Sequence, residues 1–346
     1  RFSTKGHFMT RNRSQDVLVL FGMTLVLVIP FALTLMTISQ PRAHLDLQAN
    51  PSHHGYTWSL SLFIIPAAVL GAWLWRRPES SIQFWSFWIT VAAIAGAGIL
   101  MDKFFAGTFF SFPNSDATLG IHFYGYSFSS GKWSKDIPIE EIGFYVFGIL
   151  AILLVYIWGD EFWFGAYNVD DGPRREHHHI IHLHPASMLV AVIAFVAGFY
   201  CKKFAPNVVD RAGVPGYFWF LSAVALGPSV LFFPLAQPFI NWRAFSLAAL
   251  FILFLSLFWE ATIAVPYQWW DFQHPQMLGL FINGFSQLPI EEPLLWLGVT
   301  WATVIVYESV YTMHFMDLSP LRFFFRGKKP NQQGSTHSAV HSRTVS

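Results

Sequence analysis

The stretch Pro138-Ile139-Glu140-Glu141 occurs a second time as Pro289-Ile290-Glu291-Glu292, 151 positions further along the chain. Each copy follows an aromatic-rich loop and opens a long apolar run. Proline suits the first turn of a helix, where its missing N–H costs nothing, and glutamate suits the positive end of the helix dipole. An acidic side chain at membrane depth indicates a functional role. The structural alternative is that these glutamates only cap the helix N-terminus at the membrane interface. The motif therefore predicts two membrane helices that each begin with paired carboxyl groups.

The composition is that of an integral membrane protein. Of 346 residues, 54% are hydrophobic and only 12% are charged, which is about half the charged fraction of a globular protein. The net charge of +1 suggests no nucleic-acid partner. The single cysteine, Cys201, excludes an internal disulfide and a four-thiolate metal site.

Several apolar runs are long enough to cross a membrane as helices. There are eight of them, at about 17–38, 57–75, 82–104, 139–158, 183–200, 216–236, 243–265 and 290–313. The second and sixth runs are offset by about 160 positions, and so are the third and seventh. Because four crossings return the chain to the same side, we expect an all-α integral membrane fold of two parallel four-helix repeats.

These spans divide the chain into segments. We expect an N-terminal segment 1–16, a first membrane repeat 17–158, a charged and histidine-rich connection 159–182, a second membrane repeat 183–315 and a polar tail 316–346. With the N-terminus inside, the inner segments carry about twice the Lys and Arg of the outer ones, which predicts cytoplasmic termini and outer motif loops. The expected location is the bacterial inner, or cytoplasmic, membrane.

A further acid precedes each motif inside an apolar helix end. Asp102 stands in the first half and Glu260 in the second. A buried acid avoids part of its desolvation cost by a hydrogen bond to another acid. Consecutive helical residues point about 100° apart, so only one glutamate of each motif can face a central cleft squarely. The candidate pairs are Asp102 with Glu140 or Glu141, and Glu260 with Glu291 or Glu292.

A run of histidines lies between the two predicted repeats, at 177–179, 182 and 184. The spacing of His178 and His182 would let one helix face hold a metal ion. The cluster stands alone and its flank is charged, which is typical of a solvated loop. We therefore expect no metal site.

The acid, the aromatic-rich loop and the Pro-x-Glu-Glu motif, present twice in this order, resemble the lycopene cyclase domain of the small integral-membrane carotenoid cyclases. These are heterodimeric in bacteria and fused into one chain in archaea and fungi. The resemblance is strongest over 259–292, and in the first half it rests on M-D-K-F-F-A-G-T-F-F-S-F, L-G-I-H-F-Y-G and I-P-I-E-E-I-G-F-Y-V-F. It covers about 57–158 and 216–313, and the family's glutamates correspond to Glu140, Glu141, Glu291 and Glu292.

The resemblance implies a redox-neutral reaction. A glutamic acid protonates the end of a linear, lycopene-like carotenoid, the tertiary cation closes a six-membered ring, and a base removes a proton. No cofactor is required, and a carotenoid or lipid is the ligand expected. The acid–base candidates are Glu140, Glu141, Glu291, Glu292, Glu260 and Asp102.

Aromatic faces can stabilise such a cation, although an interfacial aromatic belt is the alternative explanation for them. The candidate substrate-binding residues are Tyr267, Trp269, Trp270, Phe272 and Trp296 near the second motif, and Tyr124, Tyr126, Trp133, Phe144 and Tyr145 near the first.

Two other functions compete with a cyclase. A membrane glutamate protease needs E-E-x-x-x-R, but Tyr145 and Trp296 stand where the arginine belongs. A non-catalytic subunit could use the same fold to hold carotenoid, or to join partner chains in a larger membrane complex such as a photosynthetic one. Pigments extracted from a carotenoid-producing host would distinguish this subunit from an enzyme.

Overall fold

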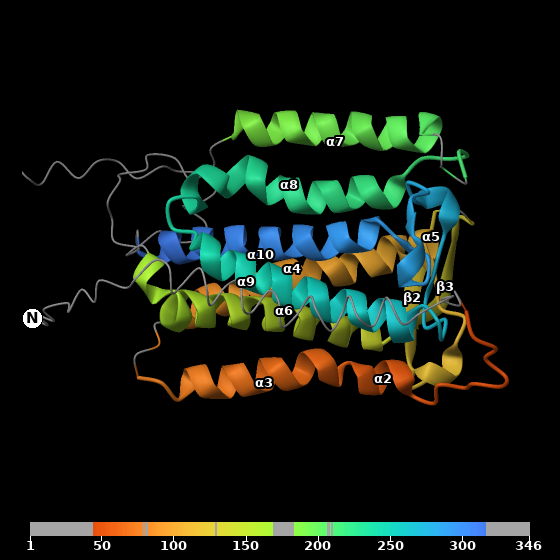
Figure 1. Cartoon of the computed structure of the whole chain (residues 1–346), viewed down its shortest axis with the longest axis horizontal. Helices are drawn as coiled ribbons and strands as arrows, with labels where there is room; N and C mark the ends of the chain where they lie inside the picture. Colours follow the sequence, from red (N-terminus) through yellow and green to blue (C-terminus); the bar gives the residue numbers. More distant parts are fainter. Residues whose placement is uncertain are drawn as a thin grey trace, which may run out of the picture.

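The computed structural model describes residues 44–315, except for 79, 81, 129, 169–182, 206, 207 and 209. Within this range the chain forms a bundle of long helices with short strands gathered at one end (Figure 1). Four sequence-based predictions lie outside the described residues. They concern the N-terminal segment 1–16, the span at 17–38, the histidines at 177–182 and the tail at 316–346.

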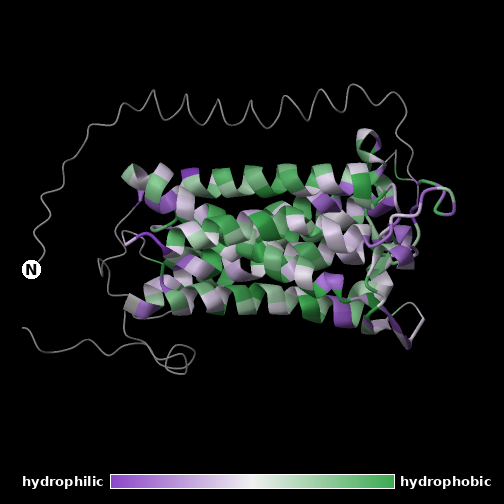
Figure 2. Ribbon diagram, turned by 90° about the horizontal axis from the view of Figure 1, so that it is seen from below, coloured by the Kyte–Doolittle hydropathy of each residue, from purple (hydrophilic) through white to green (hydrophobic). Residues whose placement is uncertain are grey.

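The described residues contain seven helical stretches that are long and apolar enough to cross a membrane. They are Gly55–Trp75, Phe84–Phe109, Glu140–Trp163, Pro185–Phe204, Gly216–Ala236, Trp242–Ala264 and Glu291–His314. Hydrophobic residues follow the length of these helices, and hydrophilic residues gather towards their ends (Figure 2). The mainly helical class predicted from the sequence is thereby confirmed, with seven helices that could span a membrane.

The helix bounds lie close to the predicted ones. The α-helices are α2 (Gly55–Ser59), α3 (Ser61–Trp75), α4 (Phe84–Met101), α5 (Gly107–Phe109), α6 (Glu140–Trp158), α7 (Pro185–Phe204), α8 (Gly216–Ala236), α9 (Trp242–Trp259) and α10 (Glu291–Phe315). Single π-helical turns extend α4, α6 and α9, at Asp102–Ala106, Gly159–Trp163 and Glu260–Ala264.

The two motif loops contain strands that the sequence did not predict. The antiparallel pairs are β1 (Phe110–Ser111) with β4 (Asp271–Phe272), β2 (His122–Ser127) with β3 (Lys132–Pro138), and β5 (Phe281–Ile282) with β6 (Leu288–Pro289). Such pairs satisfy backbone groups that would otherwise be buried without partners. The β1–β4 pair joins the two loops, because Phe110 lies opposite Phe272 and Ser111 opposite Asp271.

The helices that carry the motifs lie inside the bundle. About 61% of the span that contains α6 is buried and 56% of the span that contains α10, but only 11% of α7. α3 and α7 lie at opposite edges of the bundle in Figure 1. Because all these helices are apolar around their whole circumference, hydrophobicity alone does not decide which become central. The motif helices therefore present their acids to the protein interior rather than to lipid.

Candidate functional site

The two motifs are built in the same way. A short strand, β3 or β6, ends at the motif proline, and helix α6 or α10 begins at a motif glutamate. The N–H of Ile139 donates to the carbonyl of Ile121 over 2.9 Å, and that of Ile290 donates to Leu280 over 3.0 Å. This shared anchor fixes the direction in which each pair of glutamates points.

The first glutamate of each motif faces its own loop. Oε1 of Glu140 accepts from the N–H of Leu119 at 2.7 Å, and Oε1 of Glu291 accepts from the N–H of Leu278 at 2.5 Å. Glu140 also accepts from the hydroxyl of Thr57 at 2.5 Å. These two acids therefore fasten the loops to the helix starts.

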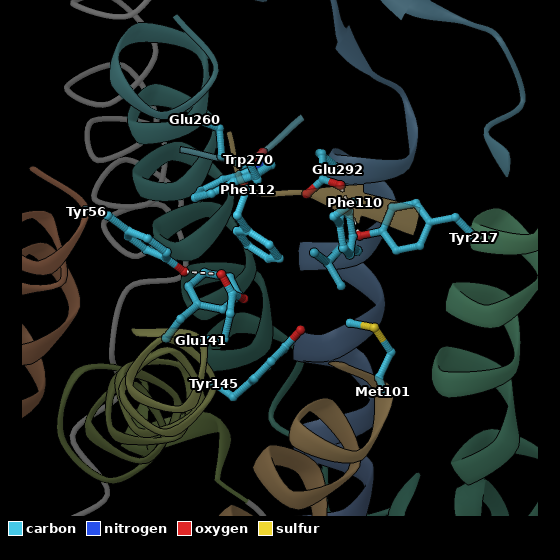
Figure 3. Close-up of a pocket in the computed structure, with 12 residues that line it drawn as sticks. Tyr56, Met101, Phe110, Phe112, Glu141, Tyr145, Tyr217, Glu260, Trp270 and Glu292 are labelled. Atoms are coloured by element: carbon cyan, nitrogen blue, oxygen red, sulfur yellow. Dashed lines mark hydrogen bonds between the residues drawn. The ribbon is translucent and has the colours of Figure 1, made fainter. Parts of the chain in front are cut away.

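The second glutamate of each motif faces a cavity between the halves. Oε1 of Glu141 accepts from the hydroxyl of Tyr56 at 2.6 Å, and Oε1 of Glu292 accepts from the hydroxyl of Tyr217 at 3.0 Å. Both carboxyl groups line the same cavity, in which the Tyr56–Glu141 bond is drawn (Figure 3). The structure thus indicates which glutamate of each motif is available for chemistry.

Each cavity-facing glutamate is paired with the acid that precedes its motif. Asp102 lies beside Glu141, and Glu260 lies beside Glu292, close enough for the charges of the two carboxyl groups to interact. Two close, buried carboxyl groups repel each other when both are ionised, which favours a proton on one of them. Such a pair is suited to holding and transferring a proton.

The preceding acids are fixed by matching aromatic donors. Oδ1 of Asp102 accepts from the hydroxyl of Tyr145 at 3.0 Å, and Oε1 of Glu260 accepts from the indole N–H of Trp296 at 2.8 Å. Each acid also begins a π-helical turn. Such turns frequently occur at functional sites, because the extra residue re-aims the side chains.

The cavity is small and acidic. Its volume is about 40 Å³, which is enough for a few water molecules. Three of its lining residues are acids and none is lysine or arginine. The described residues around it are Tyr56, Met101, Phe110, Phe112, Glu141, Phe144, Tyr145, Tyr217, Glu260, Trp270, Glu292 and Leu295.

Aromatic rings form much of the cavity wall and the layer behind it. The ring of Tyr56 stacks on that of Trp269 at 5.7 Å and lies 5.4 Å from that of Trp270. Phe144 meets Trp296 edge-on at 5.3 Å. A cation formed in this cavity would lie among π-faces and carboxyl groups, both of which attract positive charge.

The ten aromatic residues predicted to bind substrate fall into three groups. Phe144, Tyr145 and Trp270 line the cavity. Trp269, Phe272 and Trp296 are buried behind its wall. The remaining four do not line it: Tyr267, Tyr124, Tyr126 and Trp133.

Three of these four belong to the β2–β3 hairpin, which was not predicted, and none of the three lines the acid cavity. Tyr124 is 60% exposed and Trp133 is 49% exposed, and Tyr126 packs against Trp133 with ring centroids 5.3 Å apart. Trp133 instead lines a second, larger cavity beside the hairpin. Tyr267 contributes its backbone carbonyl to the side-chain amide of Asn114 at 2.8 Å.

The sequence analysis did not identify the two tyrosines that donate to the motif glutamates. A signal was present, because Gly55-Tyr56-Thr57-Trp58 corresponds to Gly216-Tyr217-Phe218-Trp219 at the start of the equivalent helix, 161 positions later. Met101, Phe110 and Phe112 also line the cavity, and they lie in the stretch 101–112 that carries the resemblance, but the sequence did not single them out as site residues. Leu295 lies outside every quoted stretch.

No group of three or more metal-ligating side chains occurs among the described residues. Of the predicted histidine run, only His184 lies in the part of the chain that the structure describes. Its side chain caps α7 by accepting from the N–H of Ser187 at 3.3 Å.

No protein-family model matches the chain, and neither a curated protein nor a solved structure shows significant similarity to it.

Proposed function

We propose that this protein is a membrane carotenoid cyclase, which closes the end group of a linear, lycopene-like carotenoid into a six-membered ring. One observation carries the proposal: two pairs of neighbouring carboxyl groups, Asp102 with Glu141 and Glu260 with Glu292, stand at a single aromatic-walled cavity whose lining holds no basic residue. This arrangement favours proton transfer to a neutral molecule and then stabilises the resulting cation.

The reaction follows from these groups. A carboxylic acid adds its proton to the terminal alkene and leaves a tertiary carbocation, whose neighbouring double bond then forms the ring C–C bond. A carboxylate removes a proton from the ring, so the product is an isomer of the substrate. Acid–base catalysis of this kind supplies roughly 10²–10⁴-fold, and each aromatic face about 0.5–2 kcal/mol. No electron is transferred, so the reaction needs no redox cofactor.

We also propose that the chain contains two parallel repeats of four membrane helices, with 17–38 as the first. The support is the matched set of contacts in the two halves, in which Tyr217, Glu260, Glu292 and Trp296 repeat the roles of Tyr56, Asp102, Glu141 and Tyr145. Both termini then lie in the cytoplasm of a bacterium, with the protein in its inner membrane. Labelling of single cysteines introduced in the motif loops tests this, because labelling of the two loops from opposite faces overturns the parallel arrangement.

A non-catalytic carotenoid-holding subunit, with or without partner chains, is the second candidate. The observation that favours it is the cavity volume of about 40 Å³, which is too small for a carotenoid end group unless side chains move. An enzyme must open this cavity, whereas a binding subunit can hold pigment elsewhere.

Expression of the chain in a lycopene-accumulating bacterium distinguishes the two candidates. The pigments are extracted and separated, and cyclic carotenoids are quantified against the amount of protein in the membrane. We expect cyclic product at levels absent from the host alone. Pigment that copurifies with the protein but is never cyclised favours the non-catalytic subunit.

A further inference from the structure

A second, larger cavity adjoins the acid cavity. It has a volume of about 720 Å³ and lies between the segment that contains β1 and the β2–β3 hairpin. Serines make up much of its lining, together with charged or ionisable groups at His122, Lys132, Lys135 and Asp136. The space has room for water, and its serines and charged groups can bind it. We call it the vestibule.

Phe110 and Phe112 line both the vestibule and the acid cavity, whereas the cavity's three acids do not line the vestibule. Phe110 begins the two-residue strand β1, and Phe112 follows that strand directly. Both are half-buried. Figure 3 shows their rings among the acids and tyrosines of the site. The two rings thus separate the vestibule from the acids.

The position of Phe110 is fixed from two directions. β1 pairs with β4, which places the ring of Phe110 5.8 Å from that of Phe272. The ring also meets Tyr217 edge-on at 5.1 Å, and Tyr217 donates to Glu292. Tyr217 therefore contacts both the ring of Phe110 and the carboxyl group of Glu292.

Resting on the proposed function, we infer that Phe110 and Phe112 form a water barrier that decides which product the carbocation gives. In a dry cavity the neighbouring double bond captures the cation and a ring closes. If water enters, its oxygen attacks the cation, a C–O bond forms, and the oxonium proton passes to a carboxylate. The product is then a tertiary alcohol, the substrate plus one water. Excluding water from a reactive intermediate is an established means of preventing such a side reaction.

The test is a product analysis of Phe112→Ala and Phe110→Ala in the lycopene-accumulating host. We expect the ratio of hydrated to cyclic carotenoid to rise by at least roughly tenfold over wild type, which corresponds to about 1.4 kcal/mol between the two competing steps. Growth in ¹⁸O-labelled water should label the new hydroxyl. Because both products are measured in one extract, the ratio does not depend on how much variant protein folds.

Two variants serve as controls. Phe112→Leu keeps most of the ring's volume and should raise the ratio less than Phe112→Ala. Phe128→Ala makes the same chemical change at an exposed residue that lines neither cavity, stacked on Phe105 at 5.1 Å, and should leave the ratio unchanged. If folded Phe112→Ala and Phe110→Ala make cyclic product with no excess of alcohol, the barrier is overturned and the cyclase stands. If wild type yields neither product, the proposed function fails and the barrier with it.

Discussion

At the scale of single residues, the two glutamates of each motif have different roles. Glu141 and Glu292 line the cavity and pair with a second acid, whereas Glu140 and Glu291 accept from loop N–H groups. Each of the four is buried, so burial alone does not distinguish the acids that face the cavity from those that hold the loops. The two kinds of glutamate differ in the groups that their carboxyl oxygens contact.

Glutamine substitutions test this division. Glu141→Gln and Glu292→Gln keep the side-chain size but remove the acidic proton, so cyclic product per unit protein should fall by roughly 10²-fold or more. We expect the larger loss at Glu292, because its partner Glu260 also lines the cavity. Glu140→Gln and Glu291→Gln are the matched controls, expected to lower protein level more than product per unit protein. Equal losses at all four positions would contradict the assignment.

The tyrosines that hold the cavity-facing glutamates give a second prediction at this scale. Tyr56→Phe and Tyr217→Phe each remove one donor to a buried carboxyl group, which costs about 1–3 kcal/mol. The carboxyl group loses its orientation, so we expect product per unit protein to fall by roughly tenfold. Tyr200→Phe, at an exposed position on α7, is the control and should behave as wild type. Unchanged activity in both cavity variants would show that the phenols are not needed for positioning.

At the scale of elements, a left-handed glycine follows each leucine whose N–H binds a first glutamate. Gly120 has φ +73° and Gly279 has φ +83°. Alanine at Gly120 would meet no atom within 4 Å, whereas at Gly279 its Cβ would lie 2.8 Å from Cγ1 of Val208.

Gly120→Ala should therefore cost about 1–2 kcal/mol from backbone strain alone, and Gly279→Ala should cost more because of the added clash. Gly284→Ala is the control, since it meets no atom within 4 Å and has no positive φ. The measurement is the thermal unfolding midpoint of each variant in detergent. A Gly120→Ala midpoint equal to that of Gly284→Ala would rule out strain at this turn.

The helices and strands also show how much of the fold could be predicted from the sequence. The bounds of the seven described spans follow from apolar runs, because a membrane helix needs a long stretch without charge. The two-residue strands β1 and β4 could not be predicted, since they form only when the two loops meet. For the same reason the sequence left open which glutamate of each motif faces the cavity. That choice depends on where the two loops place Leu119 and Leu278. The pattern of hydrophobic residues does not predict the positions of loop residues.

At the scale of the whole molecule, α6 and α10 connect the acid site to a second polar cluster one helix length away. There the hydroxyl of Tyr156 donates to Glu308, and the N–H of Asn241 donates to that hydroxyl at 3.3 Å. The rings of Tyr156 and Tyr307 meet edge-on at 6.3 Å, which packs the two central helices together. Glu308 is 3% exposed but lines neither the acid cavity nor the vestibule.

A substitution at Glu308 therefore tests whether every buried acid in this bundle takes part in the proposed reaction. Glu308→Ala leaves the hydroxyl of Tyr156 without its acceptor and opens space between the central helices, which should destabilise the protein by about 1–3 kcal/mol. Sixteen positions along α10 separate it from Glu292, roughly 24 Å of helix, so proton transfer at the acid cavity should continue. We expect a lower unfolding midpoint in detergent but wild-type cyclic product per unit of folded protein, the opposite of Glu292→Gln. A loss of product at unchanged stability would place Glu308 in the chemistry and require a proton path along the bundle.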